Sequence, residues 1–163
     1  MNVDIAAVQV AGTPDGPTPV VVLAPREADA DADADADDES DADEALPIFV
    51  GFDQAISITR GLDAVDIGRP LTHDLLLDVV EELGGRVDRV DVSDVREGTY
   101  IADLHLNTPR GDVVVDARPS DALALAARTG ASVSVEREVF EDGARPREEF
   151  DELEDIREVA DVA

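Results

Sequence analysis

The sequence predicts a single-domain α+β fold in which a mixed, largely antiparallel sheet packs against a few helices. Short apolar segments with a two-residue alternation are separated by turn residues, which is typical of antiparallel strands. Longer segments between them carry apolar residues at helical spacing, which indicates helices that cover the sheet. At 163 residues the chain is long enough for one domain with short attachments.

Residues 1–26 are expected to form an N-terminal hairpin of the domain. The segments "VDIAAVQV" (3–10) and "VVVLA" (20–24) have the composition of strands. The cluster "GTPDGPTP" between them supplies the glycines and prolines that a turn needs. The two strands are therefore expected to pair with each other.

Residues 27–45 are expected to form a disordered acidic insertion, because an Asp-Ala tract dominates them. Aspartate and alanine are poor strand formers, and like charges along one face repel each other. A calcium loop is the alternative, since carboxylates fall at four ligand positions of an EF-hand that would begin at Asp33. We disfavour it because Asp38 occupies the position where that loop requires glycine.

Residues 46–142 are expected to form the remainder of the domain. "LPIFVG" predicts a buried strand, and "FDQAISITRGL" predicts a helix with Asp53 near its start and Gly61 past its end. The next helix is the most regular in the chain, with Thr72 as a candidate N-cap and Gly84 as a stop signal. Its apolar stripe consists of Leu75, Leu76, Val79, Val80 and Leu83.

Three strands follow that helix and predict an antiparallel meander. They read "RVDRVDVSDV" (86–95), "TYIADLHL" (99–106) and "DVVVDA" (112–117), and two tight polar turns join them. One face of the middle strand should lie on the core. Its residues are Tyr100, Ala102, Leu104 and Leu106.

The last part of the chain predicts two helices around a short strand. An alanine-rich helix is expected from about Ser120 to Arg128, and "SVSVE" (132–136) is a strand. Residues 143–163 are expected to form an acidic C-terminal helical tail that docks on the domain or on a partner. The apolar stripe of this tail consists of Phe150, Leu153, Ile156, Val159 and Ala160.

The composition excludes several kinds of site. The chain has no cysteine, so disulfide bridges, thiolate metal centres and cysteine nucleophiles are excluded. There is no apolar run of about 18 residues, and the first residues lack the basic region of a signal peptide. We therefore expect a soluble cytoplasmic protein with no membrane partner.

The chain is strongly acidic. It has 40 acidic and 13 basic residues, the basic ones are all arginine, and the formal net charge is -27. Such a surface repels itself in dilute buffer, and molar salt screens the repulsion. A halophilic origin explains this bias along the whole chain. A mimic of nucleic acid is the alternative, although an acidic patch alone would suffice for that role.

Two predicted helix starts carry similar motifs, "RPLTHD" and "RPSD". A helix N-terminus offers unpaired backbone N–H groups, and an arginine beside it adds a bidentate donor for phosphate. Arg69 with Thr72, and Arg118 with Ser120, are therefore candidates for binding nucleic-acid phosphates. Ordinary helix capping by Thr72 and Ser120 is the alternative. A phosphate site requires both starts to open onto one cleft.

His73, Asp74 and Asp121 are the candidate catalytic residues at these helix starts. An unperturbed histidine titrates near neutrality and can move protons during phosphodiester cleavage. The alternative for His73, and more strongly for His105, is a hydrogen-bonded histidine without a catalytic role. Asp116 and Asp121 could hold Mg²⁺ or Mn²⁺ if they meet, but no set of three ligands has a diagnostic spacing. The metal requirement therefore stays open.

A resemblance rests on four ordered segments: "LPIFVGFDQA", "RPLTHDLL", "EELGGRVDRVDVSDVREGTYIADL" and "DARPSDALALAARTGASVSV". In this order and spacing they resemble the bifunctional nuclease family, over residues 3–142 apart from the acidic insertion. The resemblance implies an α+β fold and a nuclease activity on RNA and DNA. One position departs from the family pattern, which has a glutamate where this chain has Gln54. Glutamine can neither act as a general base nor supply an anionic metal ligand.

The sequence thus leads to two hypotheses about function. By resemblance, the protein is a nuclease that hydrolyses phosphodiester bonds in RNA or DNA. The alternative is a non-catalytic regulatory or scaffold domain that binds a protein partner or a small anion. Gln54 and the lack of a basic patch favour the alternative. A homo-oligomer is a further expectation, because exposed edges of a meander need cover.

Overall fold

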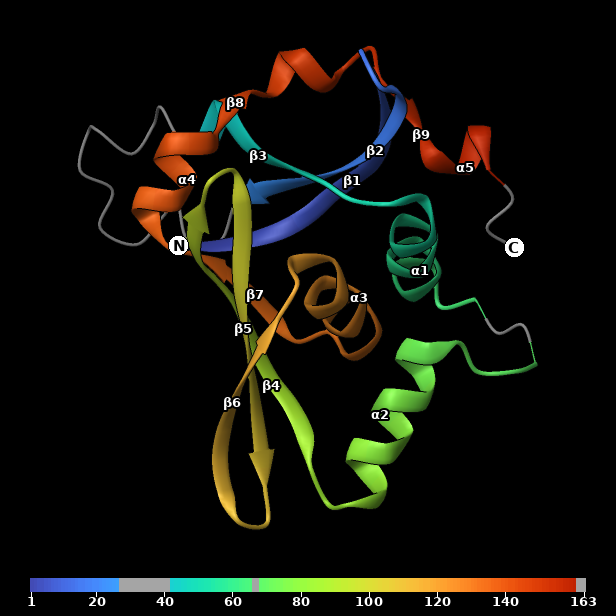
Figure 1. The fold of residues 1–163 in the computed structure, drawn as a ribbon, viewed down its shortest axis with the longest axis vertical. Coiled ribbons are helices and arrows are strands. Elements are labelled where there is room, and N and C mark those ends of the chain that lie inside the picture. Colours follow the sequence, from blue (N-terminus) through green and yellow to red (C-terminus); the bar gives the residue numbers. More distant parts are fainter. Residues whose placement is uncertain (27–41, 66–67, 161–163) are drawn as a thin grey trace.

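The computed structural model describes residues 1–26, 42–65 and 68–160, which form one α+β domain (Figure 1). The predicted fold class is confirmed. The strands in these ranges are β1 (Asn2–Thr13), β2 (Gly16–Pro25), β3 (Glu44–Phe49), β4 (Arg86–Arg96), β5 (Thr99–Thr108), β6 (Gly111–Ala117), β7 (Ser132–Val135), β8 (Arg145–Pro146) and β9 (Glu154–Asp155).

These nine strands make one sheet. Its order is β6-β5-β4-β7-β1-β2-β3-β8, and β9 pairs with β1 beside this path. The strand pairs are antiparallel except for β4 and β7, which run parallel. The predicted hairpin (β1 and β2) and the predicted meander (β4, β5 and β6) are both confirmed.

Five α-helices lie in the described ranges: α1 (Phe52–Asp63), α2 (Thr72–Glu82), α3 (Pro119–Thr129), α4 (Arg137–Gly143) and α5 (Ile156–Val159). Helix α3 lies against the sheet, and α1 and α2 pack on α3 (Figure 1). None of these helices is both long and apolar enough to cross a membrane.

The predicted acidic insertion lies mostly outside the described residues, which resume at position 42. The candidate calcium loop that would begin at Asp33 is therefore also outside them. The last two residues of the predicted insertion belong to the sheet, because Glu44 and Ala45 pair with β8 and Ala45 is fully buried.

Helix α3 is the centre of the core. Its residues from Ala122 to Ala126 are all buried, which is expected of a helix covered by a sheet and by other helices. The face of β5 that was predicted to be buried includes Ala102 and Leu104, and both are buried in the same cluster as α3. The alanines of α3 allow this close packing because their side chains are short.

Helix α1 approaches α3 closely at Gly61. A Cβ atom added to this glycine would lie 3.0 Å from the Cβ of Ala127, which is tighter than normal packing. The prediction that Gly61 follows the helix is wrong, because α1 continues to Asp63 and ends at the left-handed Ala64 (φ 52°). The glycine serves close helix packing and not helix termination.

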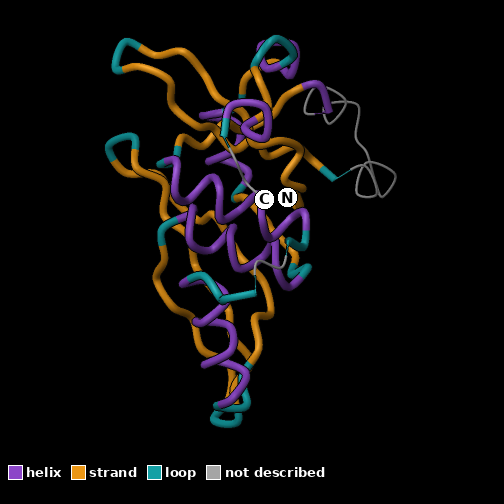
Figure 2. Tube along the Cα trace, turned by 90° about the vertical axis from the view of Figure 1, so that its right-hand side faces the viewer, coloured by secondary structure: helices purple, strands orange, loops and turns teal. Residues whose placement is uncertain are grey.

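Helix α2 forms where it was predicted, but most of its apolar stripe lies outside the core. One end of the molecule tapers to α2 and the neighbouring long strands (Figure 2). Leu83 is 74% exposed, and Val113, Val114 and Val115 of β6 are also exposed. The other exposed residues of the stripe are Leu75, Leu76 and Val79. This end of the domain therefore presents apolar side chains to solvent.

The C-terminal tail is not the single amphipathic helix that its stripe predicts. It consists of the short strand β8, a 3₁₀ helix (Arg147–Phe150), the short strand β9 and the one-turn helix α5. Docking on the domain explains the difference. Gln9 Nε2 of β1 donates to the carbonyl of Phe150 at 3.1 Å, and Ile156 is fully buried.

An ion pair between Asp63 and Arg157 fastens this tail to the end of α1. Arg157 donates from Nε to Asp63 Oδ2 at 2.8 Å and from Nη2 to Oδ1 at 2.7 Å. The hydrogen bond from Arg157 holds the pKa of Asp63 below its ordinary value of 3.8. The tail contact therefore depends on an ionised carboxylate.

An Asp63→Asn variant should lose less stability in acid than the wild type does. A carboxylate with a lowered pKa stabilises the fold above its unfolded-state pKa, and this contribution disappears as the pH falls through the folded-state pKa, here below about pH 4. Both side chains are about one-third exposed, so the effect is at most about 1 kcal/mol. Urea unfolding at about pH 7 and about pH 3 measures it.

The matched control for this prediction is Asp15→Asn, which changes an exposed carboxylate in the β1–β2 turn. An equal loss of stability in acid for Asp63→Asn and the wild type would contradict the prediction.

Candidate functional site

A cavity of about 390 Å³ lies where the starts of α2 and α3 meet the side of α1. Its lining residues are mostly polar or charged. They are Asp53, Gln54, Ile56, Ser57 and Arg60 of α1, Leu71, Thr72 and His73 at the start of α2, and Arg118 and Asp121 at the start of α3. The two helix starts therefore open onto one cleft, as a phosphate site requires.

His73 joins the three helices at this cavity. Its Nε2 lies 2.9 Å from Asp121 Oδ1, and its Nδ1 lies 2.6 Å from Ser57 Oγ. An ionised carboxylate can only accept a hydrogen bond. Nε2 therefore carries the hydrogen and donates the hydrogen bond to Asp121. In the neutral ring Nδ1 is then an acceptor, and the Ser57 hydroxyl donates to it. The imidazole is 13% exposed and is thus held on both sides.

Asp121 is also bound by Arg118, whose Nε donates to Oδ2 at 2.8 Å. Burial raises the pKa of Asp121, but the hydrogen bonds from Arg118 and His73, together with their charges, outweigh burial and keep this pKa below its ordinary value. The carboxylate is therefore ionised at neutral pH. The Arg118 side chain is 67% exposed, so its guanidinium remains accessible from the cavity mouth.

Arg128, in the last turn of α3, completes the network around Ser57. Its Nη2 donates to Ser57 Oγ at 3.0 Å, and its Nη1 donates to the backbone carbonyls of Ser57 and Ala124, both at 2.9 Å. Its Nε donates to Asp74 Oδ1 at 2.7 Å. Sequence reasoning missed both Ser57 and Arg128, because their contact depends on how α1 packs on α3.

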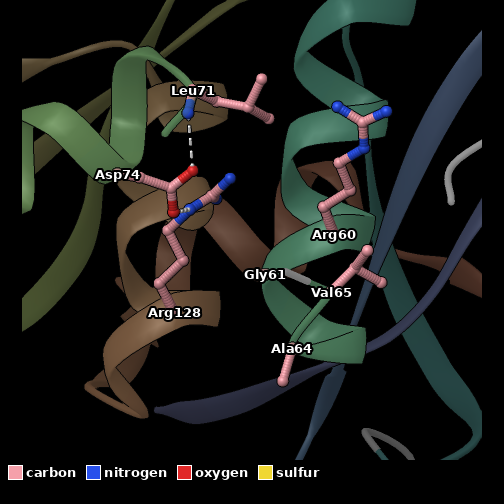
Figure 3. Close-up of a pocket in the computed structure, with 7 residues that line it drawn as sticks. All are labelled: Arg60, Gly61, Ala64, Val65, Leu71, Asp74 and Arg128. Carbon is pink, nitrogen blue, oxygen red and sulfur yellow. Dashed lines mark hydrogen bonds and ion pairs between the residues drawn. The ribbon is translucent and has the colours of Figure 1, made fainter. Parts of the chain in front are cut away.

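Asp74 lines a neighbouring cavity of about 210 Å³ and does not line the cavity of His73 (Figure 3). Its Oδ2 accepts from the backbone N–H of Leu71 at 2.9 Å, while Arg128 holds its other oxygen. Burial raises the pKa of Asp74, but the hydrogen bonds from Arg128 and Leu71 outweigh burial and lower it. Asp74 therefore holds the start of α2 against α3.

The capping roles predicted for Thr72 and Ser120 are wrong. The N-cap of α2 is Leu71, and the N-cap of α3 is Arg118, which has the extended backbone that precedes a proline. Thr72 is exposed and lines the cavity of His73, whereas Ser120 is buried and does not. Arg69 is exposed and lies outside the linings of both cavities.

The remaining candidates lie on the sheet. His105 Nε2 of β5 is 2.7 Å from Asp91 Oδ2 of β4, and Asp116 belongs to β6. Neither His105 nor Asp116 lines the cavity with Asp121. Within the described ranges, no group of three or more histidine and carboxylate side chains is placed to hold a metal ion.

Comparison with known proteins matches the chain to a family and to several relatives. A family model described as the bifunctional nuclease domain matches residues 37–148. An uncharacterized protein of Mycobacterium tuberculosis is 40% identical over 98 residues, which cover 60% of this chain and 58% of that protein. The protein named Bifunctional nuclease 2 is 31% identical over 104 residues in Arabidopsis thaliana and 29% identical over 109 residues in Oryza sativa subsp. japonica.

The chain spans only part of these relatives. The match covers 61% of this chain and 32% of the Arabidopsis protein, and 64% of this chain and 33% of the rice protein. The similarity therefore concerns one domain of the longer plant proteins.

Proposed function

Because the chain belongs to the bifunctional nuclease domain family, we propose that it hydrolyses phosphodiester bonds in RNA or DNA. The observation that carries this proposal is the His73 side chain, held between Ser57 and Asp121 in a cavity at two helix starts. The name that the two plant relatives share supports the same class of reaction.

The proposed roles follow from the position of each group. A substrate phosphate binds at the cavity mouth, where the start of α2, the start of α3 and the Arg118 guanidinium converge. His73 transfers the proton, and Asp121 orients the imidazole and stabilises its charged form. Asp74 is a positioning residue, because it acts through Leu71 and Arg128.

The candidate residues outside the cavity are proposed to act at a distance from the reacting phosphate. Arg69 is exposed and can contact a phosphate further along a bound strand. Ser120 is buried, so it supports the start of α3 and does not itself contact the substrate.

A cleavage assay tests the proposal. Labelled RNA and labelled single-stranded DNA are incubated with the protein in dilute and in molar KCl, each with and without Mg²⁺ or Mn²⁺. The salt series matters because a net charge of -27 repels nucleic acid in dilute buffer. Cleavage that co-purifies with the wild type and disappears in His73→Ala supports a nuclease. No cleavage by the wild type under any of these conditions refutes it.

Arg118→Ala should raise KM about tenfold and change kcat much less, because the lost group contributes a charge-assisted hydrogen bond to phosphate. Steady-state kinetics on single-stranded DNA measure both constants. Arg96→Ala is the matched control, since Arg96 is also an exposed arginine that pairs with a nearby aspartate, Asp94, at 3.0 Å. An equal effect of the two variants on KM would show that only the overall charge matters.

Gln54→Glu should raise kcat by about 100-fold, the lower end of the range for acid–base groups. Gln54 lines the cavity, and the resemblance to the family implies a glutamate at this position. The new carboxylate could accept a proton or help to hold a divalent cation. Gln54→Ala is the control and should leave kcat within a few-fold of the wild type. A lower kcat in Gln54→Glu would contradict the prediction.

A non-catalytic module is the second candidate function. Three observations favour it: Gln54 in the cavity, the engagement of Arg118 by Asp121, and the exposed apolar stripe of α2. Such a module would bind a protein partner or a small anion. It would become the preferred function if the wild type cleaved neither RNA nor DNA.

A further inference from the structure

We propose that Ser57 is the nucleophile at this site and that it attacks phosphorus to form a covalent phosphoseryl intermediate. The inference deepens the proposed function and rests on it for the identity of the substrate. Its geometry is that of a serine, histidine and aspartate arranged in a chain.

The direction of the Ser57 hydroxyl is the first argument. A serine or threonine in a helix commonly bonds to the carbonyl four residues earlier, as Thr59 does here with Ala55 at 2.9 Å. Ser57 instead points away from α1 and reaches His73 Nδ1 at 2.6 Å. Its hydroxyl is therefore committed to the imidazole and not to its own helix.

The second argument is the set of groups around the oxygen. His73 Nδ1 accepts the hydroxyl proton, because Nε2 already donates to Asp121. Arg128 Nη2 donates to Ser57 Oγ at 3.0 Å, so a positive charge stabilises the oxygen as its proton leaves. Asp74 and two backbone carbonyls hold that guanidinium in place.

The third argument is access. Ser57 is only 6% exposed overall, but it lines the cavity that Arg118 and Thr72 also line. A phosphate bound between the helix starts would therefore lie next to the hydroxyl.

The first half of the reaction joins the phosphorus of the scissile bond to Ser57, while its second ester bond to the rest of the strand stays intact. An oxygen lone pair of Ser57 forms the O–P bond while the hydroxyl proton moves to His73 Nδ1. The P–O bond to the leaving nucleoside breaks, and its electron pair stays on that oxygen. The leaving oxygen then takes the proton from His73 Nδ1 and departs as an alcohol.

The second half of the reaction regenerates the free Ser57 hydroxyl. A water molecule attacks phosphorus and gives a proton to His73 Nδ1. The bond between phosphorus and Ser57 Oγ breaks, and Oγ takes that proton back. The products are an alcohol end and a phosphate end. The ribose 2′-hydroxyl takes no part, so the same site can act on RNA and DNA.

Two reagents test the proposal on the full chain. In the first experiment, excess labelled single-stranded DNA is mixed with the protein, the reaction is stopped in acid, and the protein is digested for mass spectrometry. In the second, the protein is incubated with an alkyl fluorophosphonate, which bonds to a nucleophilic serine as fluoride leaves. We expect an adduct on Ser57 in both experiments, and its loss in Ser57→Ala and in His73→Ala.

The control variant is Ser134→Ala. Ser134 is a partly buried serine outside the cavity, and its hydroxyl donates to Asp91 Oδ1 at 2.5 Å. This variant should keep both the adduct on Ser57 and the wild-type rate. Thermal melting of each variant separates loss of the nucleophile from loss of the fold.

The outcomes separate this inference from the proposed function. If neither reagent leaves an adduct on Ser57, the nucleophilic role of Ser57 is overturned, whatever the cleavage rate. A fluorophosphonate adduct on Ser57 without cleavage of RNA or DNA supports the nucleophile and refutes the nuclease. An RNA product that ends in a 2′,3′-cyclic phosphate shows that the ribose hydroxyl attacked, and it also overturns the role of Ser57.

Discussion

Replacing Arg128 by alanine should lower the free energy of unfolding by about 3 kcal/mol, because it leaves buried partners without their donor. The Arg128 side chain is 8% exposed and bonds to groups on three helices. Its loss leaves the carbonyl of Ser57 and the hydroxyl of Ser57 without this donor, and it removes the cation beside the Asp74 carboxylate.

Urea unfolding in molar KCl, followed by circular dichroism, measures this change. Arg128→Lys is the informative companion, because lysine keeps the charge and loses the forked geometry. We expect it to fall between the wild type and Arg128→Ala. Arg96→Ala, at an exposed arginine, should change stability by less than about 1 kcal/mol. A comparable effect of Arg96→Ala and Arg128→Ala would contradict the structural role assigned to Arg128.

The sequence predicts those elements of the fold whose structure is determined by the pattern of neighbouring residues. The meander could be predicted because its middle strand, β5, alternates and each turn contains glycine, and both Gly98 and Gly111 have positive φ angles in the structure. Helix α2 could also be predicted, because its apolar residues recur at helical spacing. The parallel pairing of β4 with β7 was not, because strands so distant in the chain carry no local signal of their partner.

The site was predictable only in part, for the same reason. His73, Asp121, Arg118 and Thr72 were found because charged or polar residues at a helix start are a local feature. Ser57 looks like any small polar residue on a helix, and Arg128, 71 residues later, looks like a cation that complements the end of its own helix. Only the packing of α1 on α3 brings these two residues together.

The tail shows how tertiary contacts override a local period. Its apolar residues repeat at helical spacing over 150–160, yet the chain there pairs with β1 and breaks into short elements. Docking gains the burial of Ile156 and the ion pair of Arg157 with Asp63, which a free helix would not have. Short helices in water are marginally stable, so such contacts decide the structure.

Replacing His73 by alanine should lower kcat by about 10³-fold, within the usual range for a general acid–base group, and leave KM nearly unchanged. Both ring nitrogens are engaged by the protein, one by Ser57 and one by Asp121, so neither is available to bind a substrate phosphate in this arrangement. The ring can move a proton only through one of these two partners. Its loss therefore removes transition-state stabilisation and not substrate binding.

Steady-state kinetics on RNA and single-stranded DNA separate kcat from KM for this variant. His105→Ala is the matched control, because His105 is the other histidine of the chain, also faces a carboxylate, and lies on the sheet outside the cavity. It should retain the wild-type kcat. A His73→Ala variant with raised KM and unchanged kcat would instead make His73 a phosphate-binding residue. In that case Ser57 would have no base, since among the described residues only His73 is placed to accept a hydrogen bond from its hydroxyl.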